Sequence, residues 1–259
     1  MPEIPNERLS ALNSWVSSAV VDGNRAYYDR TTVLSPGHTG IEFNEKSATV
    51  SIPSVDALRK QFEKQEGSEP IGGTCRELAQ WAAVSLLKEG MVDSAEVYAC
   101  ATDSEAHYVV VAELDGQKYL VDIAYSQPVL EAIPVDGENH VSRAFSGQRG
   151  TKQAFSGEIT YTAAQKEDGS ILFKVNSPSR STEFPLCPLT NEVDAKIPGK
   201  WATATGSGYA TKVRPNGDGT YRVDSEPMGT EATLQDEFKR LHDMAKQFGD
   251  SAIKVVFEN

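Results

Sequence analysis

The stretch AHYVVVAELDGQKYLVDIAYS, residues 106–126, predicts a β-hairpin. Two runs rich in valine, tyrosine and leucine flank Asp115 and Gly116, a dipeptide typical of the two-residue type I′ turn. With these two residues in the loop, Leu114 lies opposite Gln117, and this pair determines the register of the whole hairpin.

The register predicts that His107 and Asp122 are diagonal neighbours on one face of the hairpin. The same face carries Val109, Val111 and Leu120, which indicates that it is half buried. A half-buried carboxylate needs a polar partner, and a carboxylate beside an imidazole holds one tautomer and stabilises the imidazole cation. We therefore expect the two side chains to pair, the alternative being an exposed histidine and aspartate on a polar sheet edge.

Cys75 lies in the segment IGGTCRELA, residues 71–79, where two glycines precede a helix-forming run. The free N–H groups and the dipole at a helix start favour thiolate over thiol, and Arg76 adds positive charge nearby. Gly73 and Thr74 lie where the backbone can closely approach a substrate, so we expect them to contact it. The alternative role of this cysteine is that of a small apolar core residue.

Cys75, His107 and Asp122 occur in an order that suits a nucleophile, a base and an orienting acid. Tyr125 and Ser126 follow the strand that carries the aspartate. We expect these two side chains to line the mouth of the substrate pocket. The sequence thus predicts covalent catalysis by a cysteine.

The overall charge argues against two classes of partner. The chain has 259 residues and a formal net charge of −12, whereas nucleic acids and anionic membranes attract basic surfaces. No apolar run is long enough to span a bilayer, and the start MPEIPNERLS lacks the pattern of a signal peptide. We therefore expect a cytoplasmic protein that does not bind nucleic acid or membranes; its oligomeric state is left open.

The cysteines and histidines do not predict a disulfide framework or a metal site. Cys75, Cys100 and Cys187 are an odd number at wide spacing, and no CxxC motif is present. The four histidines lack the HxxxH and HExxH spacings of zinc ligands. We expect no bound metal.

The pattern of elements predicts an α+β fold. We expect an amphipathic helix near the N-terminus, a second helix capped by Ser54, a strand that Pro53 confines to an edge or ends, and many short strands after residue 135. The expected regions are a helical N-terminal region (1–70), a central antiparallel region with the cysteine at a helix N-terminus (71–135), a β-rich region (136–225) and a C-terminal α/β part with a helix and a strand (226–259).

The segment GGTCRE followed by AHYVVVAELDGQKYLVDIAYS resembles the arylamine N-acetyltransferase family. The resemblance covers residues 71–127, and it implies that Cys75 is the nucleophile, His107 the base and Asp122 the orienting acid. It further implies a helical bundle, a β-rich centre and a C-terminal lid. The implied chemistry is acetyl transfer from acetyl-coenzyme A, or from another acyl-coenzyme A, through a cysteine thioester to a small-molecule amine or hydroxyl.

Two other functions stay open at this point. The same order of Cys, His and Asp marks transglutaminase-like and papain-like amidases and peptidases. The double glycine and the glutamate two residues after the cysteine favour the acetyltransferase side. A non-catalytic binding domain that keeps the fold is the third possibility.

Overall fold

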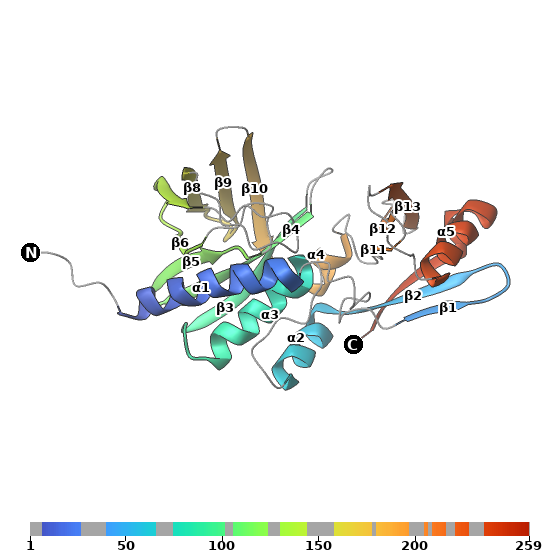
Figure 1. The fold of residues 1–259 in the computed structure, drawn as a ribbon, viewed down its shortest axis with the longest axis horizontal. Coiled ribbons are helices and arrows are strands. Elements are labelled where there is room, and N and C mark those ends of the chain that lie inside the picture. The colour runs from blue at the N-terminus through green and yellow to red at the C-terminus, as the bar shows by residue number, and fades with distance from the viewer. Residues whose placement is uncertain are drawn as a thin grey trace, which may run out of the picture.

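The structure is a computed structural model, and its elements follow the order expected of an α+β chain (Figure 1). It describes residues 7–26, 40–65, 75–101, 106–123, 130–143, 158–177, 180–196, 205–206, 209–215, 221–227 and 236–258. Within these ranges, no helix has the length and apolar character that crossing a membrane requires.

The centre of the fold is one eight-stranded sheet in which every neighbouring pair is antiparallel. Its strands, in spatial order, are β6 (Ile133–Pro134), β5 (Gln117–Val121), β4 (Ala106–Leu114), β3 (Ser94–Ala101), β10 (Arg180–Pro188), β9 (Ile171–Ser177), β8 (Glu158–Gln165) and β7 (His140–Arg143). The β-rich region after residue 135 therefore continues the sheet that the predicted hairpin begins, and residue 135 does not separate two sheets.

The sheet curls back on itself. Val135, directly after β6, forms an isolated bridge with Ala163 of β8, and the N–H of Gly137 donates to the carbonyl of Ala163 at 2.9 Å. The two ends of the sheet thus come close to closing it into a barrel.

The hairpin has the predicted register. Leu114 pairs with Gln117 and Val110 with Val121, and Asp115 and Gly116 form the turn with φ values of 52° and 78°. Positive φ at both turn residues is the signature of a type I′ turn.

Four helices lie on or near one face of the sheet. They are α1 (Glu7–Ala26), α2 (Val55–Lys64), α3 (Cys75–Lys88) and the short α4 (Asn191–Lys196). Trp15 of α1 stacks on Trp81 of α3 at 5.7 Å between ring centroids, and one hydrophobic cluster joins these helices to β3, β4 and β5. As predicted, Ser54 caps α2 by accepting from the N–H of Ala57 at 3.2 Å.

A second hydrophobic cluster fills the inner, concave side of the curled sheet. It contains Val109, Val111 and Leu120, which the sequence indicated as half buried and which are no more than 5% exposed. Phe173 and Phe184 of the β-rich region cover them, because β9 and β10 curl over this face. The hairpin face that holds His107 is therefore interior.

Two strands from the first quarter of the chain and the last strand of the chain form a separate three-stranded sheet. Its strands are β1 (Gly40–Phe43), β2 (Ala48–Pro53) and the final strand β14 (Ile253–Glu258), which pairs in parallel with β2. This sheet lies with α5 (Asp236–Phe248) at one end of the long axis in Figure 1, and the guanidinium of Arg240 lies 4.3 Å above the ring of Phe43.

Two details differ from the expectation. Pro53 ends β2 as one alternative predicted, but β2 is the central strand of its sheet and not an edge, because β14 arrives from the far end of the chain. The N-terminal region also contains a strand, β1, that was not among the expected elements. The remaining described elements are a 3₁₀ turn at Asp250–Ala252 and a small sheet of β11 (Thr205–Gly206), β12 (Tyr209–Pro215) and β13 (Tyr221–Pro227).

Candidate active site

His107 and Asp122 form the buried polar pair at the end of the hairpin. His107 is the second residue of β4, and Asp122 directly follows β5. The Nε2 atom of the histidine lies 2.7 Å from Oδ2 of the aspartate, and both residues are at most 4% exposed. The predicted pairing of these two side chains is confirmed.

Cys75 is the first residue of α3 and is buried, so the expected position at a helix start is confirmed. Its thiol lies beside the imidazole of His107, since a hydrogen bond with Cys75 and the charge of Cys75 are among the causes that raise the pKa of that histidine. Because Asp122 occupies Nε2, the ring nitrogen available to the sulfur is Nδ1. The three side chains therefore form a chain of contacts in the order carboxylate, imidazole, thiol.

The surroundings of His107 favour its charged form. Burial lowers the pKa of this imidazole, but the negative charge and hydrogen bond of Asp122, joined by the hydrogen bond and charge of Cys75, raise it from 6.5 to about 10. These interactions favour the imidazolium form of His107 over the neutral ring. The ring of Phe184 packs against it at 5.1 Å between centroids and closes its inner side.

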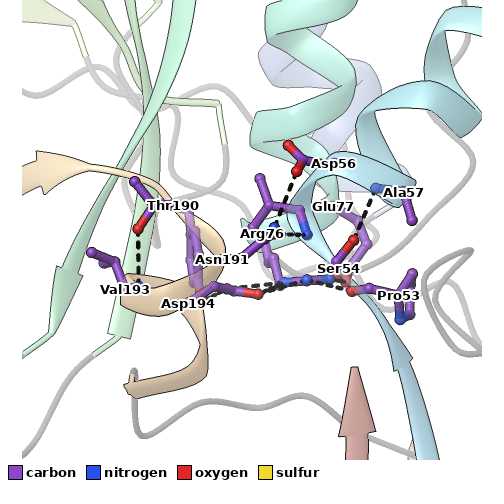
Figure 2. Close-up of polar contacts among 12 residues, drawn as sticks. Pro53, Ser54, Asp56, Ala57, Arg76, Glu77, Thr190, Asn191, Val193 and Asp194 are labelled. Carbon is purple, nitrogen blue, oxygen red and sulfur yellow. Dashed lines mark hydrogen bonds and ion pairs between the residues drawn. The ribbon is translucent and has the colours of Figure 1, made fainter. Parts of the chain in front are cut away.

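Arg76 does not serve the role expected from the sequence. Its guanidinium does not lie free beside the thiol but is bound by Asp194 of α4 (Figure 2). Nη2 donates to Oδ2 of Asp194 at 2.7 Å, and Nε lies 3.0 and 3.1 Å from the two carboxylate oxygens. Nη2 also donates to the carbonyl of Pro53 at 2.8 Å, and Nη1 lies 3.5 Å from Oε1 of Glu77. The positive charge is thus neutralised by neighbouring carboxylates.

Asp194 also contacts the strand that carries the histidine. The hydroxyl of Tyr108 donates to Oδ1 of Asp194 at 2.8 Å. Burial and the negative charge of Asp194 raise the pKa of Tyr108 well above 10, so the phenol keeps the proton that it donates. One buried carboxylate therefore joins the residue after Cys75 to the residue after His107.

The start of α4 holds Asp194 in place by binding the start of α2. Asn191 accepts from the N–H of Val55 at 3.0 Å and donates to Asp56 at 3.1 Å (Figure 2). The hydroxyl of Thr190, the residue directly before α4, accepts from the N–H of Val193 at 3.1 Å. Helices α2, α3 and α4 thus meet at their N-terminal ends beside Cys75.

The other predicted site residues stay predictions. Gly73, Thr74, Tyr125 and Ser126 lie outside the described residues, so their expected substrate contacts are untested. Asp194 was missed by the sequence analysis, because no motif near it points to a partner 118 positions away in the chain. In the described part of the chain, no cluster of histidine, cysteine or acidic side chains is arranged to hold a metal ion.

Comparisons with known proteins give fold-level matches only. No protein-family model matches the chain, and no curated protein matches its sequence. Among solved structures, the chain is similar to an arylamine N-acetyltransferase of Mycobacterium smegmatis, with 16% identity over 93% of this chain and 85% of that chain and a TM-score of 0.45. It is also similar to those of Mycobacterium abscessus (9% identity, 92% and 88% coverage, TM-score 0.45) and Nocardia farcinica (11% identity, 90% and 87% coverage, TM-score 0.44).

Proposed function

We propose that this protein is a cysteine acyltransferase that moves an acyl group from an acyl-coenzyme A to a small-molecule amine or hydroxyl. Cys75 is the nucleophile, His107 the acid and base, and Asp122 the residue that orients His107. The observation that supports the proposal is the buried pair of His107 and Asp122 at 2.7 Å, beside Cys75 at the start of α3.

In the first step, the sulfur of Cys75 attacks the thioester carbonyl carbon of the donor as a thiolate. The charged state of His107 supports this step, because an imidazolium at neutral pH stabilises a neighbouring thiolate. The tetrahedral oxyanion is stabilised by backbone N–H groups in the first turn of α3, which lack partners within the helix. As the intermediate collapses, the bond to the coenzyme sulfur breaks and His107 gives its proton to that sulfur.

In the second step, the acceptor attacks the acyl-cysteine. The neutral imidazole of His107 removes the proton of the acceptor's N–H or O–H, and the bond between the carbonyl carbon and the sulfur of Cys75 breaks. The product leaves as an amide or ester, and the thiolate and imidazolium are restored. Acid–base work of this kind contributes about 10²- to 10⁴-fold to the rate.

The contact chain alone serves an amidase or peptidase equally well. The choice of acyl transfer rests on the sequence around the nucleophile, namely the two glycines before Cys75 and Glu77 two residues after it. The experiment must therefore separate a coenzyme A donor from an amide donor.

The test is incubation with acetyl-coenzyme A followed by intact-mass spectrometry. We expect a mass gain of one acetyl group, located on Cys75 by peptide mapping and absent from Cys75→Ala. The matched control is Cys187→Ala, which removes another thiol, in β10, and should keep the adduct. His107→Gln should slow acylation by about 10²- to 10⁴-fold.

Failure to form the adduct would contradict the proposal. Release of ammonia from a glutamine side chain, or cleavage of a peptide, without any acetyl adduct would assign the same residues to an amidase or peptidase. Cysteine alkylation no faster than that of a free thiol would favour a non-catalytic domain.

A further inference from the structure

Cys75 and His107 lie on different elements, and the covalent chain between them does not determine the distance between their side chains. Cys75 begins α3, whereas His107 lies near the start of β4, beyond all of α3 and β3. A displacement of about 1 Å between reacting groups can cost about a hundredfold in rate. Some tertiary contact must therefore hold the helix start against the strand.

Asp194 makes that contact on both sides. Its carboxylate binds Arg76, the neighbour of the cysteine, at 2.7 Å and accepts from Tyr108, the neighbour of the histidine, at 2.8 Å. Side chains of consecutive strand residues point to opposite faces, so Tyr108 anchors β4 from the helix side while His107 faces the inner side.

The environment of the Asp194 contact makes it rigid. Arg76, Tyr108 and Asp194 are at most 3% exposed, and Asp194 accepts hydrogen bonds from both partners with both of its oxygens engaged. The backbone N–H of Asp194 donates to the carbonyl of Thr190 at 2.8 Å, and Asn191 ties the same turn to α2. The carboxylate therefore has little freedom to move.

Stability alone explains such a cluster poorly. Taking a guanidinium and a carboxylate out of water costs about as much as their attraction returns, and apolar replacements of such pairs are often neutral or stabilising. In some proteins a buried ion pair instead fixes the geometry of the segments that it joins.

We propose that Asp194 is a positioning residue that sets the distance between Cys75 and His107 by binding Arg76 and Tyr108 together. This inference rests on the proposed function, because it assigns a purpose to the separation of the nucleophile and the base. Asp194 acts through its two partners and does not itself touch the reacting atoms.

The primary test is Tyr108→Phe, which removes one hydroxyl and leaves the Arg76–Asp194 ion pair in place. Asp194→Asn is a poorer first choice, since it leaves a buried guanidinium without its countercharge and disturbs folding itself. The matched control is Tyr119→Phe, which removes a hydroxyl from a buried tyrosine of the neighbouring strand β5.

Two readouts are measured on folded protein well below the unfolding temperature: the rate of Cys75 alkylation by iodoacetamide and the ultraviolet absorbance of its thiolate. The absorbance is taken as the difference from the same protein carrying Cys75→Ala. We expect Tyr108→Phe to slow alkylation by about tenfold to a hundredfold and to lower the thiolate signal, and Tyr119→Phe to change the rate by less than about twofold. A loss of stability alone moves neither readout at that temperature.

Suppose that Cys75 is alkylated fast in the wild type and that Tyr108→Phe and Tyr119→Phe give equal alkylation rates and equal thiolate signals. This result would overturn the role of Asp194 and leave the proposed function standing. A wild-type Cys75 that alkylates no faster than glutathione would instead overturn the proposed function and this inference with it. The wild-type rate therefore distinguishes the two failures.

Discussion

Replacement of Asp122 by asparagine probes how His107 keeps its positive charge. Asparagine retains the size of the side chain and one accepting oxygen, but it carries no negative charge. Burial lowers the pKa of His107, and it is chiefly the charge and hydrogen bond of Asp122 that raise the value to about 10. In Asp122→Asn burial should dominate, and we expect the pKa of His107 to fall to 6.5 or below.

The size of the effect follows from the difference between the two pKa values. A rise from 6.5 to about 10 corresponds to about 5 kcal/mol of preferential stabilisation of the imidazolium, at about 1.4 kcal/mol per tenfold change in equilibrium. Burial opposes this rise and Cys75 adds to it, so about 5 kcal/mol is the net effect of all three and not the contribution of Asp122 alone.

The same shift in the pKa of His107 makes the free energy of unfolding depend on pH. Because the pKa of His107 is higher in the folded than in the unfolded state, its contribution is fully present below pH 6.5 and is lost as the pH rises through about 10. We therefore compare the free energies of unfolding of the wild type and Asp122→Asn. The advantage of the wild type should shrink by up to about 5 kcal/mol between pH 6.5 and 10.

The assay is nuclear magnetic resonance of protein labelled with ¹⁵N-histidine, titrated from pH 5 to about 10.5. The His107 signal is assigned by its absence in His107→Gln, and urea unfolding at the same pH values gives the free energies. The matched control is Asp136→Asn, which removes the carboxylate that lies 3.0 Å from the surface residue His140 and should leave His107 unchanged.

Two results would refute this reasoning. One is a wild-type His107 that loses its proton near pH 6.5, which would mean that burial outweighs the aspartate. The other is a stability difference between wild type and Asp122→Asn that stays constant across the titration, which would mean that the carboxylate supports the fold without favouring the imidazolium.

Three further substitutions test other parts of the structure, each by urea unfolding. Ser54→Ala removes the cap at the start of α2 and should lower the free energy of unfolding by about 1 kcal/mol, whereas no change would mean that the cap contributes nothing. Phe184→Ala removes a ring that is 1% exposed and packs on His107, so it should cost about 3–5 kcal/mol and also slow acylation; normal acylation would show that the ring does not hold the imidazole. Gly116→Ala places a side chain at a φ of 78° and should cost about 1 kcal/mol, and an unchanged midpoint would argue against the type I′ turn.

The local features of this chain followed from residues close together in sequence. The dipeptide Asp115-Gly116 determines the hairpin register, because only a type I′ turn joins two strands through two residues of positive φ. That register was sufficient to predict the contact of His107 with Asp122. Likewise, the start of α3 at Cys75 was predicted from the segment around it.

The burial of the site depended on segments that local patterns do not connect. The hairpin face that looked half buried is interior, because β9 and β10 return from the second half of the chain to cover it. The pairing of β14 with β2, which makes β2 a central strand, likewise joins segments about 200 residues apart in the chain.

Asp194 is the clearest case of a residue whose role only the tertiary structure decided. Arg76 looked like a positive charge acting on the neighbouring thiol, yet it is bound by a carboxylate 118 positions away. Turns, caps and strand alternation are decided by interactions among residues a few positions apart, so a sequence displays them directly. The partner of a buried charge is decided by which distant segments the packed core brings together, and that choice is made only when the whole chain folds.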